Sequence, residues 1–469
     1  MTTENCRKEE KSKAKTEKLE ESFSENLSSA MVDKAGRELP ILPSNRRNDY
    51  IATIESIVSD INIQKALTAV IRNKGAPGID GVTIEEIKKA IHLQWPKIQE
   101  EILEGEYKPS PVRRVDIPKP GGIGVRQLGI PTVIDRIIQQ AVYQELVLVF
   151  DPLFSSNSYG FRPERNAQMA VLQSRKYIKE GYEWVVDIDL EKFFDRVNHD
   201  MLMARVARHV KDKKILLLIR RFLQAGVMED GLIRPTEEGT PQGGPLSPLL
   251  SNIMLDDFDK ELEKRGIKFV RYADDCNIYV KSERAGRRVM AASVRYLTKK
   301  LKLKINHQKS AVDNPWNRKF LGFTFTKGDR RITVHRSRVK LFKNKIRGLT
   351  KKMRGSNMPD SIRKQIMPIV RGWVNYFGIA ETRSTFVKLD GWIRRKIRDI
   401  IWRQWKRPRT RYKRLKELGL KERTAKITAC SSKGPWRMAR VPGMHKALSN
   451  EKIEKMGYTS MLRIMEARS

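Results

Sequence analysis

Alternating apolar and polar positions predict short strands that carry acidic side chains. In the segment EWVVDIDL, the alternation places Asp187 and Asp189 on one face, and the opposite face is apolar. The segment FVRYADDCNIYV reads as a β-hairpin whose turn lies over Asp274 and Asp275. If the apolar faces are buried, carboxylates from two separate segments remain on the faces that are not buried.

A period of three to four residues predicts helices toward the C-terminal end. Apolar residues at positions 362, 366, 369, 373 and 377 fall on one helix face, and we expect Pro368 to kink that helix. A second predicted helix, around residues 390–401, has an apolar face of isoleucines. Its outward face is basic and consists of Arg394, Arg395 and Arg398.

The charge of the chain indicates a polyanionic partner. There are 94 lysines and arginines against 55 acidic residues, which gives a formal net charge of +39 and a pI near 10.1. Residues 331–420 hold 27 basic and 5 acidic residues, so more than half of the excess lies in under a fifth of the chain. Nucleic acid is the expected partner, because each neutralised phosphate releases counterions. Tryptophans among these arginines are available to stack on bases, namely Trp392, Trp402 and Trp405.

Composition also argues against several classes of protein. No run approaches ~18 consecutive apolar residues, so the sequence predicts no membrane-spanning segment. The cysteines Cys6, Cys276 and Cys430 lie far apart without a CxxC pair, which argues against a cysteine zinc site and a disulfide framework. The polar N-terminus lacks the apolar core of a signal peptide. We therefore expect a cytoplasmic protein without a membrane partner.

Paired carboxylates in so basic a chain indicate a site for divalent cations. Mg2+ prefers hard oxygen ligands from a few carboxylates, and substrate phosphates complete its shell. Two such ions roughly 3.5–4 Å apart can activate an attacking hydroxyl and stabilise a leaving oxygen. The residues therefore indicate phosphoryl transfer with two Mg2+ ions.

Six motifs resemble those of reverse transcriptase–maturases encoded by bacterial group II introns. YADD resembles the catalytic box, DIDLEKFFD the preceding acidic box, and GTPQGGPLSPLLSNIML the helix-forming box between them. RQLGIPTVIDRIIQQA and SYGFRP are typical of that group, and RGWVNYF resembles its thumb and maturase region. The resemblance implies an α+β right-hand polymerase with fingers, a palm that carries an antiparallel sheet, and a helical thumb.

The resemblance assigns the catalytic and metal-binding roles to Asp189, Asp274 and Asp275. Asp187 on the same strand face competes with Asp189, which is favoured because the family's first aspartate precedes an aromatic residue by five positions. Phe194 fills that aromatic position, where its ring would clash with a 2′-OH and select deoxynucleotides. Ordinary core packing is the alternative for Phe194.

Five further residues match the family's nucleotide pocket. Gln242 and Gly243 in TPQGG would contact the incoming nucleotide, since glycine permits a close backbone approach; a helix-start turn is the alternative. Lys119 and Arg126 flank a glycine-rich hairpin that would fold over the triphosphate, and a basic surface hairpin is the alternative. Lys309 matches a lysine that would protonate the departing pyrophosphate.

The expected organisation has five parts. They are a disordered mixed-charge tail with a linker, an N-terminal extension, the reverse transcriptase fingers and palm, a basic helical thumb or maturase region, and a C-terminal segment, at residues 1–47, 48–110, 111–335, 336–450 and 451–469. RNA contacts are assigned to Arg371, Arg394, Arg395 and Arg398. The missing cysteine pairs match the compact bacterial class that lacks an endonuclease domain.

The predicted activity is RNA-directed DNA synthesis from an RNA template, a DNA primer and dNTPs. The protein would also bind its parent intron RNA to assist splicing, and would copy that RNA into target DNA during retrohoming. Two alternatives stay open, a domesticated reverse transcriptase in defence or DNA repair and an RNA-binding splicing maturase with little polymerase activity. The sequence leaves the oligomeric state open, a homodimer included.

Overall fold

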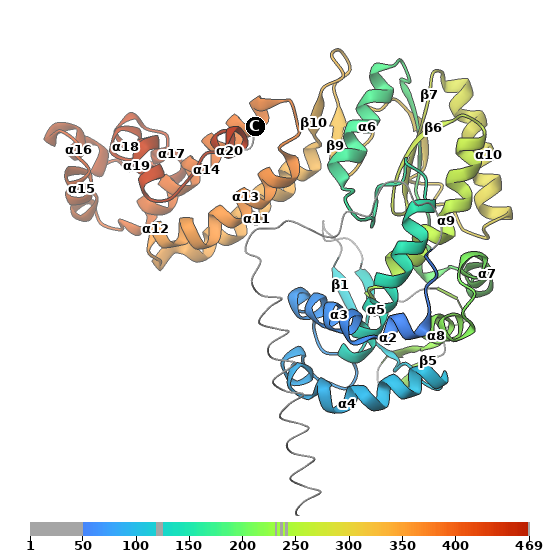
Figure 1. Cartoon of the computed structure of the whole chain (residues 1–469). Coiled ribbons are helices and arrows are strands. Elements are labelled where there is room, and N and C mark those ends of the chain that lie inside the picture. Colours follow the sequence, from blue (N-terminus) through green and yellow to red (C-terminus); the bar gives the residue numbers. More distant parts are fainter. Residues whose placement is uncertain (1–49, 119–124, 230–231, 235–237, 240–242, 468–469) are drawn as a thin grey trace, which may run out of the picture. The chain divides into compact units, whose positions relative to one another are not determined.

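An antiparallel sheet of four strands carries the acidic segments, and we call it the carboxylate sheet. A computed structural model describes residues 50–118, 125–229, 232–234, 238–239 and 243–467 of the chain. The strand order is β6–β7–β3–β8 (Figure 1). The strands are β6 (Lys268–Tyr272), β7 (Asp275–Val280), β3 (Trp184–Ile188) and β8 (Ala311–Asp313). The two acidic segments are thus neighbours, although 86 residues of sequence separate β3 from β7.

Side chains of the carboxylate sheet alternate between two hydrophobic cores, one on each face. The first core holds Val186 and Ile188 of β3, whereas the second core holds Val185 of β3. Asp187 and Asp189 share the face of Val185, because side chains two residues apart point to the same side. The alternation predicted for this segment is therefore confirmed.

The first core is built by helices that come before and after the carboxylate sheet in the sequence. They are α2 (Ile54–Val58), α3 (Asp60–Asn73), α4 (Ile84–Glu104), α5 (Val133–Phe150), α7 (His199–His209), α8 (Lys213–Gln224), α9 (Ser247–Lys264) and α10 (Glu283–Lys299). Thr53 and Thr83 begin α2 and α4 with capping boxes, which satisfy backbone N–H groups that lack a helical partner. On the opposite face α6 (Ala167–Lys179) packs against β6, so α6 and α10 flank the sheet (Figure 1).

Two smaller sheets surround the helices. One has the order β2–β1–β4–β5, and the other is the hairpin β9–β10. Their strands are β1 (Val112–Pro118), β2 (Val125–Ile130), β4 (Val227–Glu229), β5 (Leu232–Arg234), β9 (Phe323–Phe325) and β10 (Ile332–Val334). The β1–β2 hairpin is the glycine-rich, basic hairpin of the sequence, and residues 119–124 at its tip lie outside the described residues.

The apolar helix face predicted for residues 362–377 is confirmed, because all five of its side chains are buried or half-buried. The turn Ile362–Ile366 is a π-helix, and α13 (Met367–Phe377) follows directly with Pro368 as its second residue. Proline has no N–H, and its ring clashes with the carbonyl four residues earlier. The π turn interrupts the regular α-helical hydrogen bonding just before Pro368, and the predicted kink stays a prediction.

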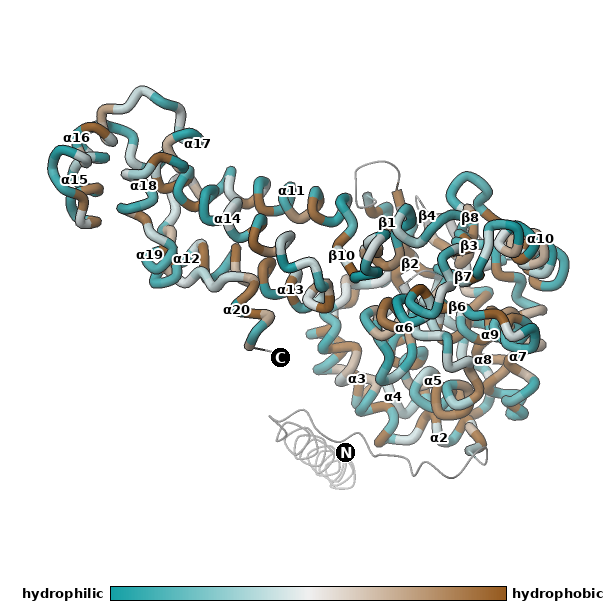
Figure 2. The backbone as a smooth tube through the Cα atoms, turned by 90° about the horizontal axis from the view of Figure 1, so that it is seen from above, coloured by the Kyte–Doolittle hydropathy of each residue, from teal (hydrophilic) through white to brown (hydrophobic). Residues whose placement is uncertain are grey.

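The helices next to α13 are amphipathic and enclose the second core. They are α11 (Arg336–Lys352), α12 (Met358–Ser361) and α14 (Arg383–Gln404). Figure 2 shows apolar and polar stretches alternating along α11 and α14, as expected for helices buried on one side. Their packing against α13 leaves the opposite sides of α11 and α14 for other contacts.

The prediction that Arg398 points outward from α14 is wrong. Its side chain is buried and donates hydrogen bonds to the Leu448 carbonyl over 2.8 Å and to the Asn450 side chain over 3.1 Å. These partners lie about 50 residues further along the chain. The periodicity of α14 alone does not reveal that a later segment covers its basic face.

The same correction applies to Arg394 and Arg395, which are half-buried. Arg395 lies 3.9 Å from the ring centre of Trp436 and donates to its backbone carbonyl. Arg394 forms an ion pair of 3.8 Å with Glu454. The three arginines therefore join α14 to the C-terminal helices, and Trp402, which we expected to be available for stacking, is also buried.

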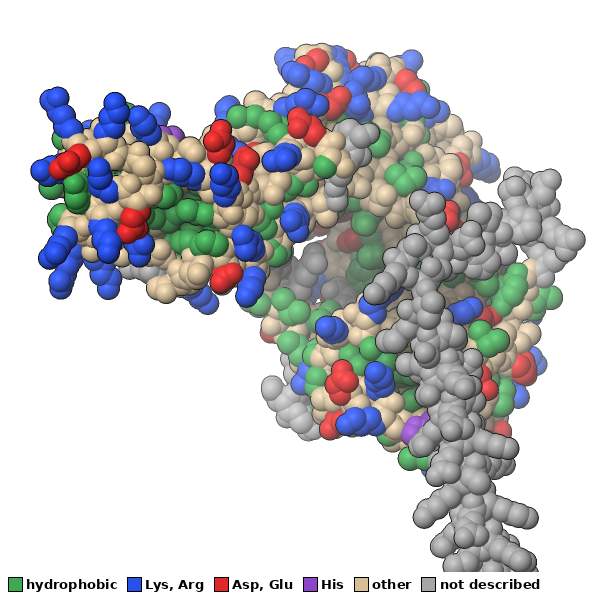
Figure 3. Space-filling model, turned by 60° about the vertical axis from the view of Figure 1, so that its left-hand side comes forward, with side chains coloured by type: hydrophobic (Ala, Val, Ile, Leu, Met, Phe, Trp, Pro, Cys, Tyr) green, Lys and Arg blue, Asp and Glu red, His purple; other side chains and the backbone are tan. Residues whose placement is uncertain are grey.

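Six short helices complete the described chain. They are α15 (Pro408–Glu417), α16 (Glu422–Ala429), α17 (Pro435–Met438), α18 (Pro442–Ala447), α19 (Asn450–Lys455) and α20 (Met461–Glu466). Lysine and arginine side chains crowd the part of the surface that α15 and α16 form (Figure 3). Across the described residues, every helix is too short or too polar to cross a membrane.

Candidate active site

The acidic segments meet at one end of the carboxylate sheet. The register pairs Ile188 of β3 with Cys276 of β7, so the next residue, Asp189, lies opposite Asp275. Directly opposed residues of antiparallel strands have Cβ atoms roughly 5 Å apart. Two carboxylates that are 86 positions apart in the sequence are therefore within reach of a shared cation.

The hairpin turn lies one residue earlier than predicted. The turn residues are Ala273 and Asp274, and Asp275 is already the first residue of β7, paired with Tyr272. Ala273 has a φ of 58°, a left-handed backbone conformation that residues other than glycine seldom adopt. The shift matters because it places Asp275 in the regular strand, with its orientation fixed by the pleat, and Asp274 in the adjoining turn.

The carboxylates repel one another strongly. Asp275 is reached by solvent, yet the surrounding protein displaces much of its hydration. That loss of hydration, together with the negative charges of Asp274, Asp187 and Asp189, raises the pKa of Asp275 to about 7. A divalent cation would relieve this repulsion, and hard carboxylate oxygens are the donors that Mg2+ prefers.

Carboxylate oxygens are suitable ligands for a divalent cation, but the described side chains do not stand at coordinating positions in this structure. Within the described part of the chain, no three acidic, histidine or cysteine side chains stand at metal-ligand geometry. Side chains on the strand ends and the turn would have to rotate toward a cation, and phosphate oxygens of a substrate would supply further ligands. The residues that would do so are Asp189, Asp274 and Asp275.

Asp187 and Asp189 differ in their basic partners. Asp187 accepts two hydrogen bonds from the Arg318 guanidinium, at 2.6 and 3.0 Å, which opposes the effect of burial that raises its pKa. Among the described residues, the basic partner of Asp189 is Lys309, in an ion pair of 3.5 Å, and the Lys309 side chain is 65% exposed. An exposed pair of this length is weak and easily displaced. Asp189 is therefore the carboxylate that is more available to a metal ion.

A buried arginine that the motif analysis did not single out holds the turn between β6 and β7. Arg271 of β6 donates to the Ala273 carbonyl and to the Asn252 side chain, both over 2.9 Å. Its Nε donates to Asp259 of α9 over 2.8 Å, and both charged side chains are buried. The signal in the sequence was an arginine inside an otherwise apolar strand, which can only be buried with a partner.

The SYGFRP segment packs directly against the same turn. A Cβ on Gly160 would stand 2.2 Å from the Ala273 nitrogen, so the close approach requires glycine. Asn252 donates to the Gly160 carbonyl over 2.8 Å, and the Tyr159 amide donates to the Arg271 carbonyl over 2.9 Å. Two of the motifs recognised in the sequence thus converge on the turn that carries Asp274.

The nucleotide-pocket residues are only partly described. Gln242 and Lys119 lie outside the described residues, and Arg126 is described by its backbone alone, opposite Ile117 in the β1–β2 hairpin. Gly243 has a φ of 134°, and a Cβ there would stand 2.5 Å from the Gly129 carbonyl oxygen. The backbone at Gly243 is therefore packed against β2, which leaves no room for a side chain.

Phe194 lies in a single 3-10 turn, Phe193–Asp195, a few residues after Asp189. Its ring is half-buried and packs edge-on against Phe193, with ring centres 5.3 Å apart. The ring also borders the first core, so both interpretations that the sequence left open, a steric gate and core packing, are consistent with its position. Arg371, the remaining predicted RNA contact, is exposed on α13.

An apolar groove of about 630 Å³ runs between α11 and α13. Its walls include Trp373, Tyr376 and Phe377 of α13, and its rim includes Arg338 and Lys345 of α11. Aromatic walls with a basic rim suit contact with a nucleic acid. The Tyr376 hydroxyl donates to the Leu321 carbonyl over 2.9 Å, which joins the groove to the turn that precedes β9.

Comparisons with known proteins agree with this geometry. Residues 117–325 match the family of reverse transcriptases, described as RNA-dependent DNA polymerases, and residues 339–419 match the maturase-specific domain of group II introns. The protein YkfC of Escherichia coli K12 is 33% identical over 290 residues, which cover 53% of this chain and 76% of YkfC. This chain belongs to the group II intron reverse transcriptase–maturase family.

One further relative and one solved structure are also similar to this chain. The group II intron-encoded protein LtrA of Lactococcus lactis subsp. cremoris is 40% identical over 206 residues, which cover 42% of this chain and 33% of LtrA. A solved telomerase of Candida albicans aligns with 82% of this chain and 68% of its own, at 14% identity and a TM-score of 0.41. The match to the reverse transcriptase family confirms the predicted right-hand polymerase fold and RNA-directed DNA polymerase activity. Enzymes of this family depend on divalent metal ions.

Proposed function

We propose that this chain extends a DNA primer along an RNA template with two Mg2+ ions held by Asp189, Asp274 and Asp275. The observation that carries the proposal is the position of Asp189 opposite Asp275 at the ends of neighbouring strands. The raised pKa of Asp275 supports it, since carboxylates that repel one another this strongly gain from a cation between them. When bound, the metal ions neutralise charge that develops on the reacting phosphate.

Other side chains of the site bind and orient the substrates. Lys309, at 3.5 Å from Asp189, would transfer a proton to the departing pyrophosphate. The ring of Phe194 would exclude a 2′-OH, and the backbone of Gly243 would contact the incoming nucleotide. Lys119, Arg126 and Gln242 complete the proposed nucleotide pocket. Positioning and electrostatics supply most of the rate in phosphoryl transfer.

We further propose that the region around α15 and α16 binds the parent intron RNA and so assists its splicing. Exposed basic residues there outnumber exposed acidic ones by nine to two: Lys406, Arg407, Arg409, Lys413, Arg414, Lys416, Lys421, Arg423 and Lys426 against Glu417 and Glu422. This surface replaces the arginines of α14 as the main RNA contact, with the exposed Arg371 of α13 as a second contact. Target DNA would bind at the same basic surfaces. The protein would act in the cytoplasm, where it would bind its intron RNA during transcription.

Extension of a primed RNA template with dNTPs, with and without Mg2+, tests the proposed activity. We expect Mg2+-dependent DNA synthesis by the wild-type protein. The Asp274→Ala variant should lose synthesis by several orders of magnitude, because a metal ligand is removed, while its affinity for RNA stays unchanged. Synthesis that survives in Asp274→Ala would contradict the assignment, and an equal loss of RNA binding would contradict the separation of the two functions.

A further inference from the structure

Helix α10 carries a stripe of positive charge on its exposed face. Arg284, Arg288, Arg295 and Lys299 are exposed and recur at intervals of four, seven and four residues, and we call them the α10 stripe. At 1.5 Å per residue the stripe is about 22 Å long. Arg287 is also exposed and bonds to Glu283, the single acidic residue of this helix.

The α10 stripe lies on the far side of the carboxylate sheet from the acidic residues. Helix α10 packs against β3, β7 and β8 on the face of the first core, and a Cβ on Gly286 would stand 2.5 Å from Val312. Asp187, Asp189 and Asp275 occupy the opposite face, on the side that α6 covers (Figure 1). A primer end bound at the carboxylates would therefore lie on the other face of the sheet from the stripe.

The α10 stripe is not an ordinary solvated helix face. Arg284 with Arg288, and Arg295 with Lys299, are like charges four residues apart, which destabilise a helix by a few tenths of a kcal/mol per pair. Helix α4 is similarly exposed, yet it mixes five glutamates with three lysines. The concentration of one sign on α10 therefore comes with a cost that binding of a polyanion would offset.

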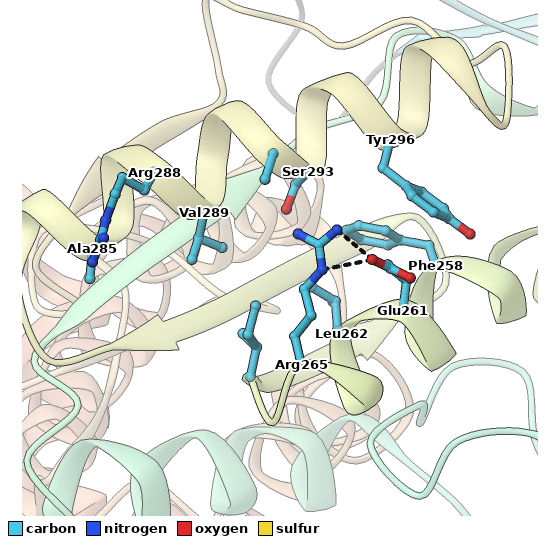
Figure 4. Close-up of a pocket in the computed structure, with 11 residues that line it drawn as sticks. Phe258, Glu261, Leu262, Arg265, Ala285, Arg288, Val289, Ser293 and Tyr296 are labelled. Carbon is cyan, nitrogen blue, oxygen red and sulfur yellow. Dashed lines mark hydrogen bonds and ion pairs between the residues drawn. The ribbon is translucent and has the colours of Figure 1, made fainter.

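A hollow of about 260 Å³ lies alongside the stripe, between α9 and α10. Phe258, Leu262, Val289 and Tyr296 form its apolar walls, and Arg288 belongs to both the hollow and the stripe. Figure 4 shows the wall residues facing the space between the helices, with Arg265 bonded to Glu261 over 2.7 Å. The hollow is smaller than the pockets of about 300–1,000 Å³ that hold drug-sized ligands, so it suits a single planar ring system.

We propose that the α9–α10 surface binds folded RNA, with the α10 stripe on the phosphates and one unpaired base in the hollow. Proteins recognise folded RNA through its backbone and through unstacked bases that enter apolar and aromatic pockets, which is the combination present here. A regular duplex offers no free base for the hollow. This inference rests on the proposed RNA-binding function and adds a surface that is separate from both the polymerase site and α15–α16.

The test compares two charge variants on opposite faces of the carboxylate sheet. The variant R288Q/R295Q removes two charges of the stripe, and K176Q/K179Q removes two exposed charges of α6 as a matched control. Binding to a short RNA hairpin with one bulged nucleotide is measured over a series of salt concentrations. We expect R288Q/R295Q to lower affinity about tenfold and to flatten the slope of log affinity against log salt by about two, since each lost phosphate contact contributes roughly 0.9. K176Q/K179Q should change neither quantity.

A charge-neutral variant tests the hollow itself. Ala292 lines the hollow, so Ala292→Phe would fill it, and Ala204→Phe on the exposed face of α7 is the matched control. Wild-type protein and Ala204→Phe should bind the bulged hairpin more tightly than the same hairpin without the bulge. Ala292→Phe should lose that preference while its salt slope stays unchanged.

Three outcomes would overturn the inference. They are equal losses in the two charge variants, a bulge preference that survives in Ala292→Phe, and an equal effect of R288Q/R295Q on a DNA duplex of the same length. Primer extension on a primed RNA template is measured in parallel and should be unchanged in all four variants. Failure of the wild-type protein to extend the primer would instead refute the proposed function.

Discussion

At the scale of single residues, Asp275 shows how the fold gathers carboxylates at the expense of its own stability. Strand pairing places it opposite Asp189, and the turn adds Asp274 beside it. Lost hydration and the neighbouring negative charges raise its pKa to about 7. A carboxylate whose pKa is raised on folding destabilises the folded protein when it ionises.

The pH dependence of stability tests this description. Without metal, stability should fall as the pH rises from about 4 toward 7, because the folded protein holds a proton that the unfolded chain releases. Asp275→Asn removes this effect, so without metal its Tm should exceed that of the wild type by roughly 1–2 °C at pH 8 and by less at pH 5. Thermal unfolding with a chelator measures the difference.

Addition of Mg2+ provides the control for this experiment. The ion should raise the Tm of the wild type at pH 8 and should leave Asp275→Asn nearly unchanged, because binding to the folded state alone stabilises it. A Tm difference between the two proteins that is the same at pH 5 and pH 8 would contradict the raised pKa.

Arg271 acts through the turn rather than on the substrate, and we regard it as a positioning residue. Arg271→Lys keeps the charge but loses the forked contacts to Asp259, Asn252 and Ala273. We expect kcat to fall about 10–100-fold with little change in the KM for dNTP, because a displacement of the turn misplaces the metal ligands. The concentration of Mg2+ needed for half-maximal activity should rise.

Steady-state primer extension over a range of dNTP and Mg2+ concentrations makes this measurement. Arg220→Lys is the matched control, since Arg220 pairs with Asp200 at the surface, where such pairs contribute little. If Arg271→Lys merely lowered the fraction of folded enzyme, its Mg2+ requirement would be unchanged, and the positioning role would be refuted.

At the scale of elements, basic residues on neighbouring helices have opposite roles. Arg398 on α14 is buried and bonds to the segment that leads from α18 into α19, whereas the cations of α15 and α16 face solvent. Arg398→Gln should lower the free energy of unfolding by about 1–3 kcal/mol, because buried acceptors lose their donor. The triple variant R409Q/K413Q/K416Q should leave stability unchanged and flatten the salt slope of RNA binding by about 2–3.

Chemical denaturation and RNA binding at several salt concentrations separate these two effects. The contrast would fail if Arg398→Gln flattened the salt slope without loss of stability. It would also fail if the triple variant on α15 unfolded the protein.

At the scale of the whole molecule, the sequence predicts what depends on local pattern. Alternation along β3 and the repeat in α13 lie within a few residues, so the strand faces and the buried helix face are as predicted. The position of the turn at Ala273–Asp274 was missed by one residue, since a left-handed alanine in a hairpin is unusual. The family of the chain and its polymerase activity were predicted from six motifs, which occur in the same order along the chain as in that family.

Contacts between distant segments were beyond such reasoning. The C-terminal helices cover Arg394, Arg395 and Arg398 with residues that lie 40 to 60 positions further along the chain. The periodicity within α14 cannot reveal these contacts. The ion pair of Arg271 with Asp259 likewise depends on how α9 packs against β6. Burial of a charge can be suspected from an apolar context, but its partner is fixed only by the fold.

The most direct test of the account is a crystal structure with primed RNA template, a non-reactive dNTP analogue and Mn2+ in place of Mg2+, with the ions located by anomalous scattering. We expect two peaks within about 2.0–2.4 Å of oxygens from Asp189, Asp274 and Asp275, beside the primer end and the triphosphate. Peaks at Asp187 with none at Asp189, or ions bound to the triphosphate alone, would contradict the assignment.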